Sequence, residues 1–359
     1  MHVRFVGEAD DGISVSSHHA RALAQAGVAV SFEGAQPPEG GGGGRADAIH
    51  VVTFEQQSNA LLRRLVAVRM AGAAIVRYWT GRDALWAKFH GPTREFARTL
   101  VQLGAVQLCR TAALAEELAQ WGIEATPIPV ISTNLSSAAS PRAMPPAFTV
   151  LSYLPRDRRM FHGGAIVDAL VRRLPGVRFL VLGDAGEGFG GLRNVEGLGT
   201  VEDAARAIQR ATAVVDARLD GAMSRMVLEA MCHGRHVVSS HSLPHACAAR
   251  TVEEFEKGVR LLRGQAEFNL AGREFVCREH DQPAAVRTLR QVLEEAVGPG
   301  RLNLAIAGGV RGATAALRNL HLLGRRSFAL PEPETLPPEA VALRALLSCT
   351  SQANAVVTA

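Results

Sequence analysis

The chain has 359 residues, of which 47% are hydrophobic and 20% are charged, and its formal net charge is +5. This length allows two domains of ordinary size, and the composition excludes a disordered protein. No run of about 18 apolar residues occurs, and the first residues lack the apolar stretch of a signal peptide, so we expect a cytoplasmic protein without a membrane span.

The first part of the chain alternates strand-like and helix-like segments. Strands are predicted at residues 2–6, 27–34, 48–53, 73–78, 106–109 and 126–130. Strands that alternate with helices predict a parallel sheet with helices on both faces, here over residues 1–135. Residues 136–147 are rich in serine, alanine and proline without a period, which predicts a linker.

The alternating pattern restarts at residue 148 and defines a second domain, residues 148–297. Its strands are predicted at residues 148–153, 177–183, 213–217 and 236–239, and an amphipathic helix at 282–297 is expected to close it. We therefore predict an α/β protein with two Rossmann-like αβα domains facing each other across a cleft. Ligands in such sheets bind at the carboxyl ends of the strands.

Residues 298–359 are expected to form a helical extension or tail of unknown role. Arg311, Arg318 and Arg325 recur there every seven residues in a leucine-rich segment. This helix could be solvated or packed, or it could bind a partner or the inner face of a membrane. The overall basic charge has the same two readings, a solvated surface or one that attracts phosphate or anionic lipid.

The composition also excludes several ligands. Aromatic residues make up 5% of the chain and no basic–aromatic patch occurs, so nucleic acid is not an expected partner. Five widely spaced cysteines without a CxxC pair predict free thiols. The turn that carries Cys232, His233 and His236 offers poor metal geometry, so no metal site is expected. The run GDAGEGFGG lacks the GxGxxG spacing of a dinucleotide site.

The stretch DGAMSRMVLEAMCHGRHVV, residues 220–238, is the most informative part of the chain. Glu229 lies within an otherwise apolar helical run, and a buried acid is costly unless it has a fixed partner. The loop of small residues before it would leave backbone N–H groups at a helix N-terminus, which suits a phosphate. The pattern indicates a nucleotide or nucleotide-sugar site. The plainer alternative is a helix acid that points to solvent.

Two Rossmann-like domains, a linker and the run LEAMCHGRHVV resemble a GT-B glycosyltransferase, most closely the retaining enzymes of family 4. The resemblance covers roughly residues 1–297. Within VLSYLPRDRRMFHGG, Arg156 falls at the arginine of the family, and within VLGDAGEG the family's Gly-Asp pair corresponds to Gly183 and Asp184. Glu229 matches the second acid of the family's E-x7-E element.

The resemblance implies how a donor would be bound in the second domain. Glu229 would hold the ribose hydroxyls of the nucleotide, and backbone N–H groups at Ser224, Arg225 and Met226 would meet the diphosphate. The leaving diphosphate gains negative charge, which cations and backbone donors stabilise. Arginine offers a planar fork that suits phosphate oxygens, so Arg156 is a candidate catalytic residue; it could equally be a surface charge.

The chain departs from the family pattern at two places. Gly221 stands where the family has the first acid. The nearest acid, Asp220, comes one place earlier and is a further catalytic candidate. The family's lysine is missing. Its positive charge would have to come from Arg158, from Arg159, which we take as catalytic, or from His162, which we place at the donor site.

The first domain matches the family more loosely. Gly12 opens the loop after the first strand, where the family places glycines close to the donor phosphates. Asp83, after the fourth strand, is the best polar candidate for a catalytic role, and His50 falls where the family often has a histidine. Each has an ordinary alternative: a turn glycine, an exposed loop acid and a hydrogen-bonded histidine.

The resemblance implies a retaining, metal-independent glycosyltransferase. It would need no cofactor beyond a nucleotide-sugar donor, UDP- or GDP-linked, and its acceptor could be a glycan, a lipid or a small molecule. The departures leave a second hypothesis open, a non-catalytic GT-B protein that binds a nucleotide sugar or a protein partner. A third is a relative of another class, such as a sugar-nucleotide epimerase. The oligomeric state is not predicted.

Overall fold

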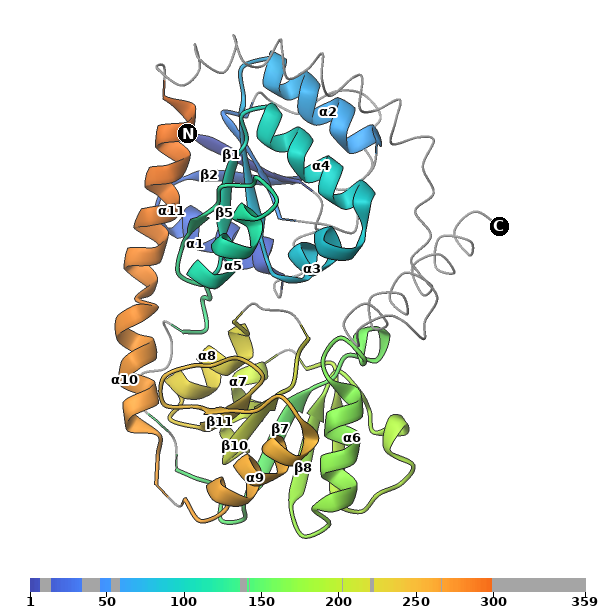
Figure 1. Cartoon of the computed structure of the whole chain (residues 1–359). Helices are drawn as coiled ribbons and strands as arrows, with labels where there is room; N and C mark the ends of the chain where they lie inside the picture. The colour runs from blue at the N-terminus through green and yellow to red at the C-terminus, as the bar shows by residue number, and fades with distance from the viewer. Residues whose placement is uncertain are drawn as a thin grey trace. The chain divides into compact units, whose positions relative to one another are not determined.

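The structure is a computed structural model that describes residues 1–6, 14–33, 46–52, 59–135, 141, 143–201, 203–219, 223–265 and 267–298. Gly12, Asp220 and the expected helix around Arg318 therefore lie outside the described residues. The described residues form two compact units, one of residues 1–133 with 281–298 and one of residues 134–280 (Figure 1).

The N-terminal unit is built on a parallel sheet with strand order β2-β1-β3-β4-β5-β6. The strands are β1 (His2–Val6), β2 (Ala29–Glu33), β3 (Ala48–Val51), β4 (Ala74–Trp79), β5 (Val106–Cys109) and β6 (Thr126–Pro127). The helices are α1 (Val15–Gln25), α2 (Asn59–Met70), α3 (Arg82–Phe89), α4 (Gly91–Gln102), α5 (Ala112–Ala119) and α11 (Gln282–Val297). The strand order reverses between β1 and β3, where doubly wound folds bind ligands.

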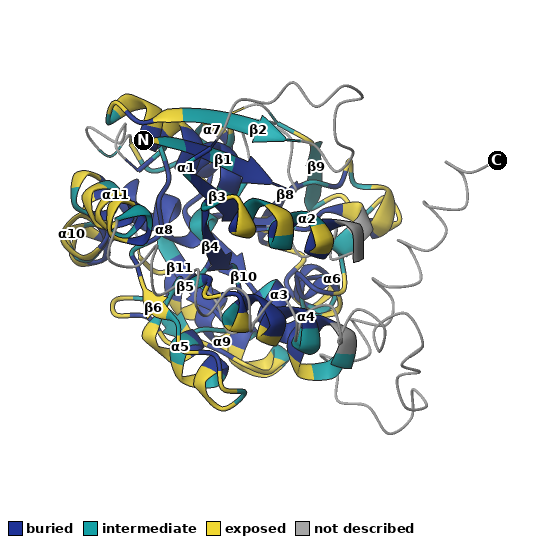
Figure 2. Ribbon diagram, turned by 90° about the horizontal axis from the view of Figure 1, so that it is seen from above, coloured by how far each residue is buried: buried dark blue, intermediate teal, exposed yellow. Residues whose placement is uncertain are grey.

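Successive side chains of each strand point to opposite faces of the sheet, and this unit has a hydrophobic core on each face. Val76 packs with Leu23 and Leu289 on the face of α1 and α11. Its neighbour Ile75 packs with Leu62 and other residues on the face of α2 and α4. A strand buried on both faces reads as a continuous apolar run, which is why a strand is predicted at residues 73–78. Figure 2 shows the central strands buried and the outer faces of the helices exposed.

Helix α11 corrects one prediction. Its place in the sequence predicts that it closes the second domain, but Leu289 and Leu293 lie in the core of the N-terminal unit. Gln282 anchors its start, since its Nε2 donates to the Val130 carbonyl at 3.0 Å and its Oε1 accepts from the Ser132 amide at 2.7 Å. An amphipathic pattern shows that one helix face is buried, but not which sheet covers it.

The C-terminal unit has a parallel sheet with strand order β12-β11-β10-β7-β8-β9. The strands are β7 (Thr149–Tyr153), β8 (Arg178–Leu182), β9 (Val195–Gly199), β10 (Ala213–Asp216), β11 (His236–Ser239) and β12 (Cys247–Ala248). The helices are α6 (Gly164–Arg173), α7 (Ala204–Gln209), α8 (Arg225–Cys232), α9 (Val252–Leu262) and α10 (Leu270–Glu279), with 3-10 turns η1 (Arg156–Arg158) and η2 (Glu187–Phe189). This is the Rossmann strand order, and it reverses between β7 and β10.

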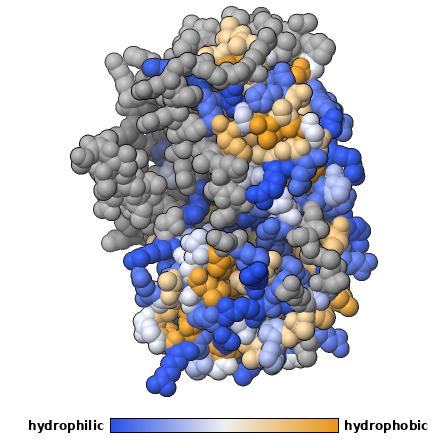
Figure 3. All heavy atoms as spheres, turned by 180° about the vertical axis from the view of Figure 1, so that it is seen from behind, coloured by the Kyte–Doolittle hydropathy of each residue, from blue (hydrophilic) through white to orange (hydrophobic). Residues whose placement is uncertain are grey.

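The two parallel sheets with their flanking helices confirm the predicted α/β fold class of two Rossmann-like αβα domains. In the described part of the chain no helix is long and apolar enough to cross a membrane. The large hydrophobic side chains exposed there are Met1, Met70, Met160, Leu261 and Leu270. On the face shown in Figure 3, hydrophobic groups are interspersed with hydrophilic ones.

Candidate functional site

The candidate site lies at the carboxyl edge of the C-terminal sheet, where its strand order reverses. The segments that follow β7, β8 and β10 meet there, because these strands are parallel and β7 pairs with both β8 and β10. Nine of the sequence-predicted residues lie on these segments or on α8: Arg156, Arg159, His162, Gly183, Asp184, Ser224, Arg225, Met226 and Glu229. These residues are spread over 74 positions of the sequence, and the order of the strands places their segments at the same edge of the sheet.

Glu229 is buried on α8, with 4% of its surface exposed. Its Oε1 accepts a hydrogen bond from Asn134 Nδ2 at 3.3 Å and lies 3.3 Å from Arg225 Nε. The burial excludes the alternative of a helix acid that points to solvent. A carboxylate held by a guanidinium and an amide has a fixed orientation, and its oxygens can accept hydrogen bonds from hydroxyl groups.

The start of α8 has no side-chain cap. Ser224 is the N-cap residue, but its side chain makes no capping hydrogen bond. The first-turn amides of α8 are therefore not satisfied by the cap side chain, and the N-terminus of a helix carries partial positive charge. Glu229 follows about one turn later, so the acid and the amide groups belong to one rigid element.

Arg159 is held within the protein by three contacts. Its Nη1 donates to Asp184 Oδ2 at 2.9 Å, its Nη2 forms an ion pair with Asp168, and its guanidinium lies 4.4 Å from the ring centre of Phe189. The arginine thereby ties the segment after β7 to α6 and to the segment after β8. Two carboxylates already surround this cation, so the geometry favours a positioning role over contact with a diphosphate.

Asp184 and Gly183 shape the segment after β8. Asp184 Oδ1 accepts the Gly186 amide at 2.7 Å, while Oδ2 takes the arginine contact. Gly183 has a φ of +84°, and a Cβ there would lie 2.8 Å from the Pro155 Cα. Only glycine allows the two segments to approach this closely. Both residues therefore build the site's frame.

Arg156 and His162 differ from Arg159 in their surroundings. The Arg156 side chain is 81% exposed and pairs with the exposed Glu187 at 3.0 Å. His162 is buried and contacts the rings of Tyr153 and Phe161 edge-on, with centroid distances of 4.9 and 5.2 Å. Arg156 thus offers a cation that can turn to a ligand, whereas His162 is fixed by packing.

A charged pair at the end of β10, Asp216 and Arg218, was not predicted from the sequence. Arg218 Nε lies 3.4 Å from Asp216 Oδ1; the Asp216 side chain is buried and the Arg218 side chain is 9% exposed. Ser240 Oγ donates to the Arg218 carbonyl at 2.7 Å, which joins this segment to the one after β11. The sequence carried a signal for this pair, since Asp216 directly follows the buried run AVV and Arg218 comes two positions later.

Asp83 has the environment of a structural residue. It is completely buried on α3, and its Oδ1 accepts from the amides of Thr80, Gly81 and Ala84 at 2.8 to 3.1 Å. Its Oδ2 lies 3.4 Å from Nη2 of the buried Arg77. An acid so saturated with protein donors cannot contact a substrate in this structure, so we leave Asp83 out of the proposed site.

His50 is likewise part of a core. It stacks on Phe5 with a centroid distance of 4.9 Å, and its Nε2 lies 3.4 Å from Nδ1 of His19. Burial lowers the pKa of His50 to about 3, so the imidazole is neutral at physiological pH. This matches the alternative of a histidine hydrogen-bonded inside the domain.

Comparisons with known proteins establish the fold. No protein-family model matches the chain, and no curated protein matches it in sequence. Anabaena HepE in complex with UDP-glucose has a TM-score of 0.61 at 15% identity, over 82% of this chain and 100% of that chain. Sucrose-phosphate synthase from Thermosynechococcus elongatus has a TM-score of 0.62 at 12% identity, over 82% and 98%.

Staphylococcus aureus TarM is similar over a smaller share, with a TM-score of 0.53 at 12% identity over 68% of this chain. The chain spans about half of TarM's length, 55%. These similar structures are GT-B glycosyltransferases, and the chain has the GT-B fold.

Proposed function

We propose that the protein is a retaining glycosyltransferase, related to family 4, that transfers a sugar from a UDP- or GDP-linked donor to an acceptor. The observation that carries this proposal is the burial of Glu229 on α8, one turn after an uncapped helix start, at the reversal point of the C-terminal sheet. The GT-B fold supports it. The donor would bind to the C-terminal unit and the acceptor to the N-terminal unit.

Each group has a stated task in this proposal. Glu229 accepts hydrogen bonds from the ribose hydroxyls, with its carboxylate oriented by Arg225 and Asn134. The first amides of α8 donate to the diphosphate. As the bond between sugar and diphosphate breaks, these dipoles stabilise the negative charge of the leaving group. Basic residues supply the remaining charge, so the reaction is proposed to need no metal ion.

Arg156 is the cation best placed to meet the diphosphate. Its pairing with Glu187 is between two exposed side chains, and such a pair contributes only about 0–1 kcal/mol. Exchanging Glu187 for a phosphate is therefore inexpensive. Arg159 would have to abandon two carboxylates, one of them buried, which costs more than a surface pair.

Transfer assays with UDP-, GDP- and ADP-linked sugars test this function directly. We expect release of a nucleoside diphosphate that persists in the presence of EDTA. We expect Arg156→Ala to lower kcat/KM, while Arg206→Ala, another exposed arginine of this unit on α7, serves as the matched control and leaves it unchanged. Equal activity in both variants would remove Arg156 from the site.

The confinement of Arg159 between two carboxylates favours one alternative, a GT-B protein that binds a nucleotide sugar without transferring it. With this arginine occupied and the family's lysine absent, fewer cations remain for the leaving group. A donor that binds but is neither transferred nor hydrolysed would support this alternative. Conversion of the donor's sugar without any acceptor would instead indicate an epimerase.

A further inference from the structure

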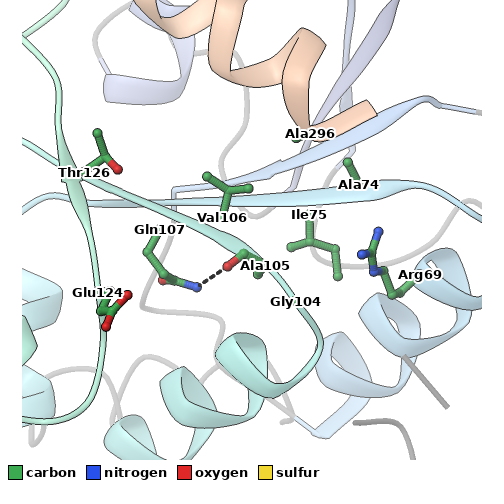
Figure 4. Close-up of a pocket in the computed structure, with 10 residues that line it drawn as sticks. All are labelled: Arg69, Ala74, Ile75, Gly104, Ala105, Val106, Gln107, Glu124, Thr126 and Ala296. Atoms are coloured by element: carbon green, nitrogen blue, oxygen red, sulfur yellow. Dashed lines mark hydrogen bonds between the residues drawn. The ribbon is translucent and has the colours of Figure 1, made fainter. Parts of the chain in front are cut away.

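We propose a second ligand site in the N-terminal unit, a pocket that binds a small organic anion through Arg69. The pocket has a volume of about 390 Å³ and lies at the amino ends of β4, β5 and β6, the edge opposite to the carboxyl ends of the strands (Figure 4). Pockets that hold small ligands begin at about 300 Å³.

Arg69 supplies a buried positive charge with an open hydrogen-bonding group. Only 7% of its surface is exposed. Its Nε donates to the Leu103 carbonyl and its Nη1 to the Ala73 carbonyl, both at 3.1 Å. Among the described residues, its Nη2 has no acceptor and no carboxylate lies within ion-pair distance. A guanidinium carries five N–H donors; two are used here, and both hydrogens of Nη2 are among the three that remain for a ligand.

The two carbonyl contacts do not balance a full charge. Leu103 is the C-cap of α4, and the end of a helix carries only about half a negative charge. Burial lowers the pKa of Arg69, so desolvation works against its positive charge. A bound carboxylate or phosphate would supply the missing charge and form charge-assisted hydrogen bonds.

The pocket is kept open beside Nη2. Gly104 has a φ of +73°, and a Cβ there would approach Arg69 Nη2 to 3.4 Å. Ala74 and Ala296 are further small lining residues. The Gln107 side chain lines the pocket in a fixed orientation. Its Oε1 accepts from Trp79 Nε1 at 2.9 Å, and its Nε2 donates to the Ala105 carbonyl at 3.1 Å. Figure 4 shows this amide turned to the backbone.

The remaining lining residues limit the class of ligand. Ile75 and Val106 offer apolar surface, and Glu124 lines the pocket on the side of β6. A ligand with a carboxylate or phosphate at one end, an apolar middle and a hydroxyl or amino group toward Glu124 fits this sequence of groups. A multiply charged anion would meet repulsion from Glu124, so a compact anion of low charge is favoured.

Calorimetric titration of the full-length chain tests this site, with acetate, inorganic phosphate and 4-hydroxybutyrate as probes at constant ionic strength. We expect 4-hydroxybutyrate to bind more tightly than acetate, and Arg69→Gln to weaken binding about tenfold or more, the cost of losing a charged hydrogen bond. Phosphate distinguishes a phosphate ligand from a carboxylate one. If none of the three binds the wild-type chain, the proposal is wrong.

A second variant avoids disturbing the carbonyl contacts of Arg69. Gly104→Asp places a carboxylate beside Nη2 and should occupy the site from within, so that added anion no longer binds. Gly122→Asp is the matched control, because Gly122 has nearly the same φ of +74° and nothing lies within 4 Å of its Cβ position. Binding that survives equally in both aspartate variants would mean that the anion binds elsewhere, for example at the start of α8. This result would overturn the proposal.

Discussion

Substitution of Arg159, which contacts Asp168 and Asp184, distinguishes a positioning residue from a residue that binds the diphosphate. In Arg159→Ala, Asp184 keeps the Gly186 amide but loses its cation while only 6% exposed. Breaking one partly buried ion pair of this kind costs about 3 kcal/mol, and the lost stacking on Phe189 adds about 0.5–1 kcal/mol. We expect a loss of about 3–4 kcal/mol in the free energy of unfolding of the C-terminal unit.

The direction in which UDP affinity changes distinguishes the two roles of Arg159. Arg159→Lys keeps the charge but cannot bridge two carboxylates, so under the positioning role we expect it to weaken UDP binding by several-fold. Asp168→Asn loosens the contacts of Arg159 from one side and should weaken UDP binding in the same direction. Chemical denaturation measures stability, and calorimetry with UDP measures affinity.

The opposite result would refute this reasoning. If Arg159 contacts the diphosphate, neutralising Asp168 releases the guanidinium and UDP binds more tightly, whereas Arg159→Lys retains much of the affinity. Asp203→Asn, which alters an exposed pair of this unit, should change neither quantity.

Three further predictions concern stability. Asp83→Ala should cost about 3–5 kcal/mol, because it leaves a buried arginine without its acid, while UDP affinity stays unchanged; denaturation and titration check both. The pKa of His50 falls to about 3 on folding, so the unfolded chain binds the proton first and stability should drop as pH falls below about 6.5, by up to about 1.4 kcal/mol per pH unit; in His50→Phe this slope should diminish. Gly163→Ala should abolish stable folding of its unit, since the new Cβ would lie 2.2 Å from the Ala217 carbonyl, whereas Gly122→Ala, in open space, should cost only about 1–2 kcal/mol; equal melting temperatures would contradict this.

The sequence was sufficient to predict the two parallel sheets, because their central strands are buried on both faces and read as apolar runs separated by helical periods. The side of the sheet on which α11 packs could not be predicted. Leu289 shows the same spacing whichever unit covers it, and only the complete fold decides.

The sequence places the candidate-site residues at one edge of the sheet but does not predict their contacts. Residues that follow parallel strands meet at one edge, so Arg156, Gly183 and Glu229 could be grouped from topology. The partners of Arg159 could not, because Asp168 and Asp184 lie 9 and 25 positions further along the chain. Only the packed structure shows that they meet one guanidinium.

Asp83 had a signal that pointed to its actual environment. In the tetrapeptide Thr80-Gly81-Arg82-Asp83, Gly81 is the N-cap of α3 and Asp83 is an acid in its first turn, where the helix dipole favours a negative charge. Asp83 Oδ1 accepts the Thr80 amide at 2.8 Å. A capping interpretation therefore predicts this acid better than a catalytic one.

Calorimetric titration of UDP-glucose and GDP-glucose into the wild-type chain and into Glu229→Gln tests the central claim most directly. Glutamine keeps the shape of Glu229 but weakens its hydrogen bonds to ribose hydroxyls, so we predict that the preferred donor binds about tenfold or more weakly to the variant. Glu279→Gln, an exposed acid on α10, should bind the donor as the wild type does. Equal affinity in all three proteins would contradict the assignment of a nucleotide-sugar site to Glu229.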